Sequence, residues 1–445
     1  MPERSRFVHV RELLLTAGPA LLLVLGGFWL ASLFVSPAPP NRLSIAAAGK
    51  RSPYWEAAQR YREYLASNGV DLAVVETSGS LENLALMRDP NSGVAAAFVQ
   101  GGISSSSDLP HVYSLGRMFY EPVWIFYQGP DKLERLTELV GKRVLIGPAA
   151  SATATLATRL LAASGVTAGN TTFLNMELPA YVAALSEGRA DAGLLVLGPQ
   201  AQTIQRLLAN PKVRLMSVAQ ADAYVQRFAF LSKIEMKEGV VDFARNVPPT
   251  DTLMLTTTAA IVVRESLHPA LANLLTQAAI VVHAQPRLDG NGETALFERA
   301  GAFPRPDDQE FPLSPDALRV YKSGPPLLQR VLPFWLATLV DRLFVLILPA
   351  IGILLPVLRF APVVYTWRVR RRIVYWYRVL KRAEDDLGPS PGAELIRERI
   401  DEIDRIEEAV NRLPVPLGFT NQLYDLREHI DVVRRRLLAL KPAGA

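Results

Sequence analysis

The sequence of 445 residues predicts an α/β domain of two lobes, flanked by two transmembrane helices and followed by a C-terminal α-helical hairpin. Three observations lead to this fold class. Short apolar runs alternate with amphipathic segments through the middle of the chain, which is typical of a parallel sheet covered by helices. Two uncharged apolar stretches enclose that middle part. Apolar residues recur every seven positions near the C-terminus, as they do in paired helices.

Length and composition limit the classes of function. The length allows two or three domains, and an apolar fraction of 49% is ample for a large core. The chain contains no cysteine, which excludes disulfides, thiolate metal sites and a cysteine nucleophile. Much of the net charge of +5 lies in one basic cluster beside an apolar stretch. This position indicates a membrane flank rather than a surface for nucleic acid.

The first apolar stretch covers residues 13–35 and contains no charged residue. Its length matches a bilayer span. The stretch is longer than the apolar part of a cleaved signal peptide, and the prolines that follow it disfavour cleavage, so we expect an uncleaved anchor. A signal peptide is the alternative. Arg4, Arg6 and Arg11 precede the stretch and place residues 1–12 in the cytoplasm.

The second apolar stretch is residues 343–358, and the apolar residues before it extend it toward a span over residues 336–358. A cluster of Arg and Lys follows without an acidic residue, which is typical of a cytoplasmic exit. A buried core helix is the alternative. We therefore expect a two-pass protein of the bacterial inner membrane, with the lipid bilayer as a partner, the main domain outside and both termini in the cytoplasm.

These assignments divide the chain into consecutive segments. They are a cytoplasmic N-terminus (1–12), a transmembrane anchor (13–35), an extracytoplasmic two-lobed domain (41–330), a second transmembrane helix (336–358), and a cytoplasmic basic collar with a helical hairpin (359–445). Within the two-lobed domain we expect lobe 1 at about 41–120 and 255–325, and lobe 2 at about 125–250.

The pattern predicts the elements of the two lobes in chain order. Lobe 1 starts with strands at 42–48, 71–76 and 94–99, and helices at 53–66 and 81–88. After a strand at 123–127, the alternation restarts in lobe 2 with strands at 142–146, 172–176 and 191–197, and helices at 152–164 and 179–187. A β-branched run at 252–263 returns to lobe 1, and a helix at 268–283 packs there.

Several motifs give the middle of the chain a resemblance to a known family. They are GKRSPYWEAAQ, LVGKRVLIGPAASATATLA, ALSEGRADAGLLVLG and RESLHPALANLLTQAA. With them, residues 42–330 resemble the TAXI family, the solute-binding subunits associated with TRAP transporters, and residues 301–337 look like the end of membrane-anchored members. The resemblance implies a periplasmic-binding-protein-like fold of type II. It also implies capture of a small anionic solute, such as a dicarboxylate or amino acid, for TRAP-type membrane subunits.

The loops that follow the strands are the expected binding site. In open α/β sheets, ligands bind beyond the carboxyl ends of the strands, and in a two-lobed protein these ends face one cleft. The loop at 147–155 follows a strand and opens a helix. We expect Ser151, Ala152 and Thr153 to hold a carboxylate or phosphate there. The alternative is that a hydroxyl of this loop only caps the helix.

Further candidates follow the other strands. In the facing loop, Ser52 caps a helix that begins at Pro53, and Tyr54 lines the pocket. The next strand ends supply polar groups and glycines, which tight turns explain equally well. The complete expected ligand-binding set is Ser52, Tyr54, Ser80, Gln100, Gly101, Ser151, Ala152, Thr153 and Gln200.

No motif indicates catalysis. None of the five histidines has an H-x-x-x-H spacing, and no G-x-S-x-G sequence is present. We expect a protein that is not an enzyme and that uses no cofactor and no metal.

The C-terminal segment predicts two short helices. Ile396, Ile403 and Val410 repeat every seven residues, and a second set at 423, 430 and 437 does the same. The hairpin packs on itself or on the helix before it, or it offers a surface for a second copy or a cytoplasmic partner. The alternative function is therefore a ligand-sensing or scaffold protein that signals through this hairpin.

Overall fold

The computed structural model describes residues 22, 25–27, 29, 32, 37–285, 296–297, 299–385, 392–413, 415 and 417–440. The chain forms two compact units. We call Pro37–Asp341 the α/β unit. The helical unit combines Met1–Ser36 with Arg342–Ala445.

One sheet runs through the whole α/β unit, in the order β2-β1-β3-β10-β4-β7-β5-β6, with β8 attached to β4 and β9 to β10. Its strands are β1 Arg42–Ala46, β2 Asp71–Val75, β3 Ala96–Gln100, β4 Val112–Tyr127, β5 Arg143–Leu145, β6 Thr172–Leu174, β7 Ala192–Val196, β8 Arg214–Leu215, β9 Ser232–Met236 and β10 Thr252–Arg264. The parallel group β2-β1-β3 forms lobe 1. The parallel group β7-β5-β6 forms lobe 2.

Two long strands, β4 and β10, carry the chain from lobe 1 to lobe 2 and back. The first part of β10 pairs with β9 in lobe 2, and its last part, residues 259–263, pairs with β3 in lobe 1. β4 pairs with β10 along most of its length, and residues 123–127 then pair with β7. The sequence pattern predicts only this last part of β4, which is a continuous apolar run, whereas the earlier part is interrupted by Gly116, Arg117 and other polar residues.

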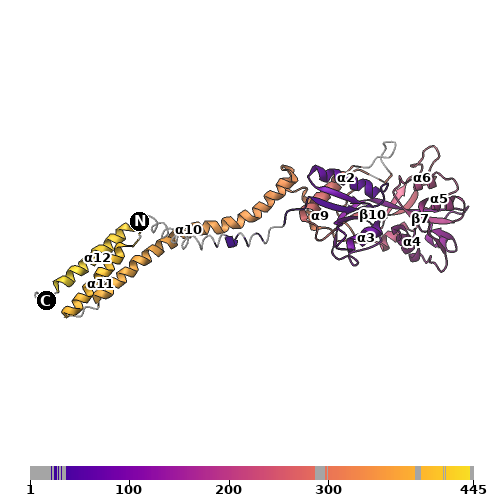
Figure 1. Ribbon diagram of the computed structural model, residues 1–445. Coiled ribbons are helices and arrows are strands. Elements are labelled where there is room, and N and C mark those ends of the chain that lie inside the picture. Colours follow the sequence, from indigo (N-terminus) through magenta and orange to yellow (C-terminus); the bar gives the residue numbers. More distant parts are fainter. Residues whose placement is uncertain are drawn as a thin grey trace. The chain divides into compact units, whose positions relative to one another are not determined.

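Helices cover both faces of each lobe (Figure 1). In lobe 1, α2 (Pro53–Ser67) and α8 (Pro269–His283) share one core, and α3 (Ser80–Arg88) packs on the opposite face. The other helices of the unit are α4 Ala152–Ala163, α5 Leu178–Ser186, α6 Gln202–Leu208, α7 Ala221–Arg227 and α9 Pro315–Ser323, with short 3-10 turns at Leu136–Leu139 and Leu327–Arg330. In lobe 2, α4 and α7 cover one face, and α5 and α6 cover the other.

The start of α2 shows how the sequence sets a helix boundary. Ser52 has extended backbone geometry, and its side chain accepts a hydrogen bond from the Trp55 amide at 3.2 Å. Pro53 at the first helical position needs no such partner. Further along the helix, Tyr61 and Leu65 are fully buried. Burial of a large apolar side chain contributes about 1.5–3 kcal/mol, so packing fixes the helix on the sheet.

A segment that we call the strap, residues 303–314, runs along the outer edge of β4 in lobe 1. Arg117 and Arg305 exchange two backbone hydrogen bonds, at 3.0 and 2.8 Å. Farther along the same edge, Ser114 donates its N–H to the carbonyl of Pro312 and accepts from the N–H of Ser314, each at 2.8 Å. The strap therefore satisfies backbone groups that β10 does not reach on this side of β4.

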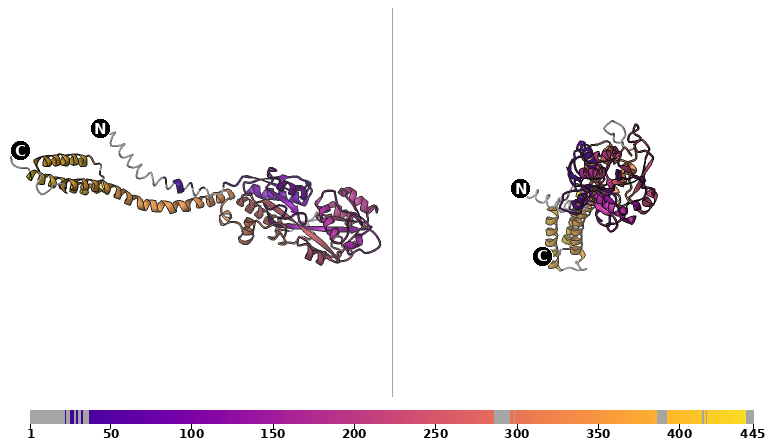
Figure 2. Two further views of the ribbon diagram at one scale, coloured as in Figure 1. Left: turned by 90° about the horizontal axis from the view of Figure 1, so that it is seen from below. Right: turned by 90° about the vertical axis from the view of Figure 1, so that its right-hand side faces the viewer.

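The helical unit contains most of α10 (Phe334–Asp385), with α11 (Ala393–Asn411) and α12 (Thr420–Ala439). Figure 2 shows α11 and α12 side by side along the later turns of α10. Their heptad residues share one buried core with α10: Ile373, Leu380, Ile403, Ile406, Val410, Leu426, Ile430, Val433 and Leu437. Of the packing alternatives, the structure thus has the hairpin packed on the helix before it.

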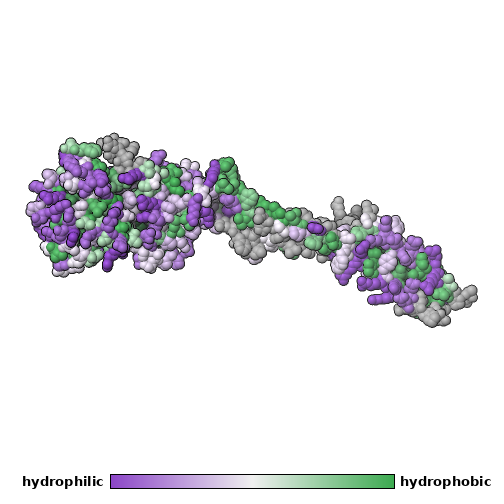
Figure 3. Space-filling view, turned by 180° about the vertical axis from the view of Figure 1, so that it is seen from behind, coloured by the Kyte–Doolittle hydropathy of each residue, from purple (hydrophilic) through white to green (hydrophobic). Residues whose placement is uncertain are grey.

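The expected two-pass membrane topology is contradicted. Within the described residues, no helix combines the length and the apolarity that a bilayer crossing requires. The expected second span, residues 336–358, is not a separate element, because α10 is one helix of 52 residues that includes both the apolar run and the arginines after it. Its exposed apolar side chains include Phe344, Ile351 and Leu355, and Figure 3 shows apolar surface along this helix. The expected first anchor, residues 13–35, lies mostly outside the described residues.

Candidate functional site

The candidate site lies where β4 and β10 cross between the lobes. Glu121 of β4 and Thr257 of β10 are cross-strand partners. On β10, Thr257 lies between the part that pairs with β9 in lobe 2 and the part that pairs with β3 in lobe 1. We call this position the hinge floor.

A polar cluster surrounds the hinge floor. The Tyr54 hydroxyl donates to Glu121 Oε1 at 2.9 Å and lies 3.4 Å from Ser80 Oγ. Ser80 Oγ in turn accepts the N–H of Gln100 at 3.0 Å. Tyr54 and Ser80 stand at the starts of α2 and α3, and Gln100 ends β3. Elements far apart in sequence thus meet at one polar position because parallel strands end at the same edge.

Three atoms of this cluster are buried without a hydrogen-bond partner among the described residues: Gln100 Nε2, Glu121 Oε2 and Thr257 Oγ1. Their residues are 4%, 9% and 0% exposed. A buried polar group without a partner costs about 1–3 kcal/mol, so three neighbouring ones require an explanation. Adjacent strands in register place these side chains on one face of the sheet.

Burial also changes the acid–base properties of the cluster. Loss of solvation raises the pKa of Glu121 to about 7, and the hydrogen bond from Tyr54 only partly offsets this effect. Burial, together with the neighbouring Glu121 carboxylate, holds the pKa of Tyr54 well above its usual value. Tyr54 is therefore a permanent donor, and Glu121 changes charge near neutral pH.

The loops of the two lobes touch above this cluster. A Cβ atom on Gly198, which follows β7, would lie 3.3 Å from Pro53 Cγ at the start of α2. Trp124 Nε1 donates to the Leu197 carbonyl at 2.9 Å. The first contact joins the lobes beside Tyr54, and the second holds the loop after β7 against β4 within lobe 2.

Gly102 forms a second link between the lobes. Its N–H donates to both oxygens of Glu310 in the strap, at 3.0 and 2.8 Å, and its carbonyl accepts from Arg159 of α4 at 2.9 Å. The Arg159 guanidinium lies 4.7 Å from the ring centroid of Phe230. With φ at +94° and Phe230 2.6 Å from the position of a Cβ atom, this residue has to be glycine. Burial raises the pKa of Glu310 to about 7.

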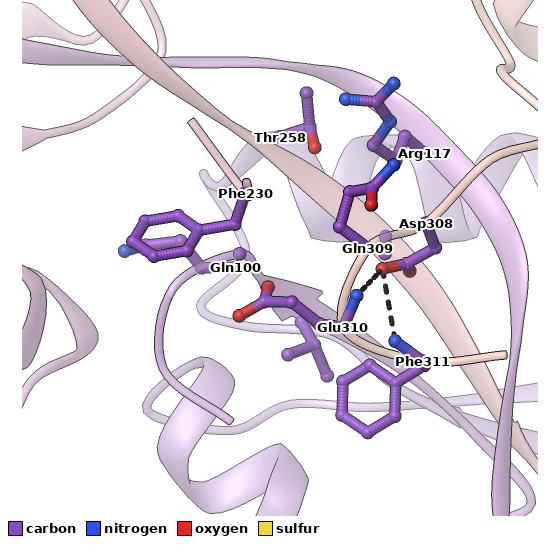
Figure 4. Close-up of a pocket in the computed structure, with 11 residues that line it drawn as sticks. Gln100, Arg117, Phe230, Thr258, Asp308, Gln309, Glu310 and Phe311 are labelled. Atoms are coloured by element: carbon purple, nitrogen blue, oxygen red, sulfur yellow. Dashed lines mark hydrogen bonds between the residues drawn. The ribbon is translucent and has the colours of Figure 1, made fainter. Parts of the chain in front are cut away.

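A pocket with an empty volume of about 340 Å³, its open mouth included, lies beside this link (Figure 4). Asp308, Gln309, Glu310 and Phe311 of the strap form one wall, and Phe230 of lobe 2 lies opposite. Asp308 Oδ1 accepts the N–H groups of Glu310 and Phe311, at 2.9 and 3.3 Å. The described residues offer no group of three or more His, Asp or Glu side chains that fits a metal ion.

The structure separates the expected site residues into two sets. Tyr54, Ser80 and Gln100 belong to the polar cluster, and Gly101 lies against it, since a Cβ atom there would be 2.5 Å from Thr257 Oγ1. Ser52 caps α2 and is only partly buried.

The second set is the expected anion loop of lobe 2, with its neighbour Gln200. Ser151 Oγ accepts from the Ala154 amide and donates to the Pro148 carbonyl, so its hydrogen bonds stay within its own loop. Thr153 is buried beside Gly147, and Ala152 is partly buried. Gln200 is exposed. The capping alternative thus describes Ser151, and the structure shows no contact of this loop with the polar cluster.

Sequence reasoning did not identify Glu121, Thr257, Arg159 and Glu310. Glu121 and Thr257 lie inside strands, and only the register of β4 with β10 brings them together. One signal was present in the sequence. Glu121 is the only acidic residue in the second half of β4, which is otherwise apolar and aromatic. Acidic residues are almost never fully buried in such a strand unless they are paired.

The chain is similar to several solved structures at low sequence identity. Solved structures similar to the chain include an effector-binding domain of a BenM variant (14% identity, 55% of this chain and 95% of that one, TM-score 0.37). An ancestral arginine-binding protein bound to arginine is similar at 13% identity (54% and 91%, TM-score 0.34). A periplasmic sulfonate-binding protein from Methylobacillus flagellatus is similar at 12% identity (56% and 71%, TM-score 0.35).

The chain has no match among curated proteins. A protein-family model described as the NMT1-like family matches residues 45–322, which include the hinge floor and all strands of the sheet apart from the first residues of β1. This range is more than half of the chain. The chain therefore belongs to the NMT1-like family.

Proposed function

We propose that the α/β unit binds a small solute between its two lobes, at the hinge floor. The observation that carries the proposal is the group of three buried polar atoms without partners at this position, on Gln100, Glu121 and Thr257. A solute that hydrogen-bonds to them in the closed state, and loses these bonds in an open state, stabilises closure by its difference in affinity. The described cluster is built for binding, and we propose no chemical step.

The finer assignment, a TAXI-type subunit that delivers an anionic solute to a TRAP-type transport system, rests on the sequence motifs alone. The alternative, a scaffold that signals through the C-terminal hairpin, gains no support from the helical unit. Most of its heptad residues are buried against α10, although Val432 and Leu438 of α12 are exposed.

A thermal-shift screen of the purified full-length protein tests solute binding. The panel contains amino acids, amines, dicarboxylates, oxoacids, sulfonates and phosphorylated metabolites. A ligand at about a hundred times its Kd stabilises the folded state by about 2.7 kcal/mol, which is a visible shift.

The Tyr54→Phe variant sharpens this test, because it removes one hydroxyl and keeps the buried ring. We expect it to weaken binding of any hit about tenfold, as measured by calorimetry. The control is Tyr113→Phe, a hydroxyl of β4 outside the cluster, which is expected to leave the affinity unchanged. A well-folded protein that binds no member of the panel would overturn the proposal.

A further inference from the structure

Resting on the proposed function, we infer that the solute carries a basic nitrogen, and that this group binds at the hinge floor between Glu121 and Thr257. The class of solute is then an amine or an amino acid, and simple dicarboxylates are excluded.

The geometry places the two acceptors within reach of one small group. Directly opposed residues on antiparallel strands have Cβ atoms about 4.5–5.5 Å apart, and Glu121 and Thr257 are such a pair. Gly101 has no side chain, so the hydroxyl of Thr257 approaches the end of β3 to 2.5 Å from the position of a Cβ atom. The backbone at the end of β3 therefore comes close to Thr257, and the register places the side chains of Glu121 and Thr257 on one face of the sheet.

Hydrogen-bonding capacity decides what the solute has to offer. Tyr54 already donates to Glu121 Oε1, which leaves Oε2 as an acceptor without a donor. The Thr257 hydroxyl can accept as well as donate, and Gln100 Nε2 can only donate. A solute therefore needs a donor group for Glu121 and an acceptor for Gln100. An ammonium group with a neighbouring oxygen, as in an amino acid, supplies both.

An ionised Glu121 disfavours a purely anionic solute. Among the described residues, no Lys, Arg or His forms an ion pair with Glu121, although the carboxyl group is only 9% exposed. A buried carboxylate without a counter-charge is costly, and a second carboxylate beside it would add repulsion. A cationic group from the solute removes both costs. Its binding also favours the ionised form of Glu121, whose raised pKa lies close to neutral.

Glu121 is not the only buried carboxyl whose pKa is raised to about 7. The carboxyl of Glu310 has a similar pKa, and its surroundings can be compared. Glu310 accepts two hydrogen bonds from Gly102 and lies near Arg159, so its carboxylate already has partners. The titratable group bonded to Glu121 is Tyr54 of α2. The ring of His283 from α8 lies 5.7 Å from the ring of Phe119, two residues away on β4. The prediction therefore concerns Glu121 and not acidic residues in general.

Calorimetry with matched solutes tests the inference on the full-length protein. Each amino acid is compared with its decarboxylated amine and with its deaminated carboxylic acid. We expect binding by amino acids or amines, and none by the deaminated acids. Glu121→Gln is expected to weaken binding about 30-fold, because it removes a charge-assisted hydrogen bond. Thr257→Val, which keeps the shape, is expected to weaken it about fivefold. Glu63→Gln, at an exposed position of α2 outside the cluster, is the control and should stay within about threefold.

The outcomes separate the two proposals. Binding of carboxylic acids without a basic nitrogen would leave solute binding intact and overturn the inference about the amine. The same conclusion follows if Glu121→Gln and Thr257→Val fold normally, by circular dichroism, and bind an amine as tightly as the unmodified protein. If no solute of any class binds, both proposals fail together.

Discussion

Glu121 combines two properties that seldom occur together in a structural residue. It is buried on a crossing strand, and one of its oxygens has no partner in the described structure. A carboxyl group placed only for stability would be paired or replaced by an apolar residue of similar size. We therefore attribute its presence to binding, and the cost of keeping it is measurable as a dependence of stability on pH.

The first prediction concerns this dependence. The pKa of Glu121 is about 7 in the folded protein, above the usual value of 4.5. The folded state therefore holds the proton more tightly, and the free energy of unfolding is highest below about pH 4.5 and falls as the pH rises toward 7. The loss is at most about 3 kcal/mol. Glu121→Gln should abolish this contribution to the pH dependence of the unfolding free energy, measured by urea unfolding at pH 5 and pH 8.

Glu310 provides the comparison for this experiment. The pKa of its carboxyl is also raised to about 7, so it adds a loss of the same sign over the same range. Each single variant should reduce the difference between pH 5 and pH 8, and the double variant should reduce it most. Equal differences in the unmodified protein and in Glu121→Gln would show that Glu121 does not titrate as we expect.

The strand ends of lobe 1 depend on one side chain of α3. Asn83 is fully buried, and its Nδ2 donates to the carbonyl of Phe98 at 2.8 Å and to the carbonyl of Ala47. Its Oδ1 accepts from the Thr77 hydroxyl at 2.7 Å. The side chain thus joins the ends of β1, β2 and β3 to the helix that carries Ser80.

The second prediction is that Asn83→Ala lowers the free energy of unfolding by about 3 kcal/mol. The substitution leaves the buried carbonyl of Phe98 without its side-chain donor. Thr77 keeps a partner, because its hydroxyl also contacts the Ala47 carbonyl. Asn91→Ala on the exposed loop is the control and should change stability by less than about 0.5 kcal/mol. Chemical denaturation of both variants decides the matter.

Most elements of the sheet follow from the sequence, and the site does so only in part. Strand and helix alternation predicts β1, α2, β2, α3 and β3 in the right order, because each has a clear apolar pattern. The polar residues at these ends, Tyr54, Ser80 and Gln100, follow from the same pattern. Glu121 and Thr257 do not, because their pairing depends on the register of strands about 130 residues apart, which no local pattern records.

At the scale of the whole molecule, the two units have separate cores. The α/β unit has four clusters of buried apolar side chains, and the helical unit has its own cluster in α10, α11 and α12. Each unit therefore has the means to fold as one cooperative structure.

The third prediction is that calorimetry of the full-length protein resolves two unfolding transitions. Ile430→Ala, in the core of the helical unit, should lower one midpoint and leave the other in place, because it costs about 2–5 kcal/mol in that core alone. Leu160→Ala in lobe 2 should do the reverse. A protein truncated after Asp341 should keep the transition that Leu160→Ala shifts. A single transition that responds to both substitutions would contradict the separation.

The strap has a consequence that concerns other copies of the chain. In lobe 1, β4 is the last strand of the sheet, and an open strand edge invites a further strand from a neighbouring molecule. The hydrogen bonds of Arg305, Pro312 and Ser314 occupy that edge from within the same chain. Besides forming one wall of the pocket, the strap thus protects the protein against aggregation by strand addition.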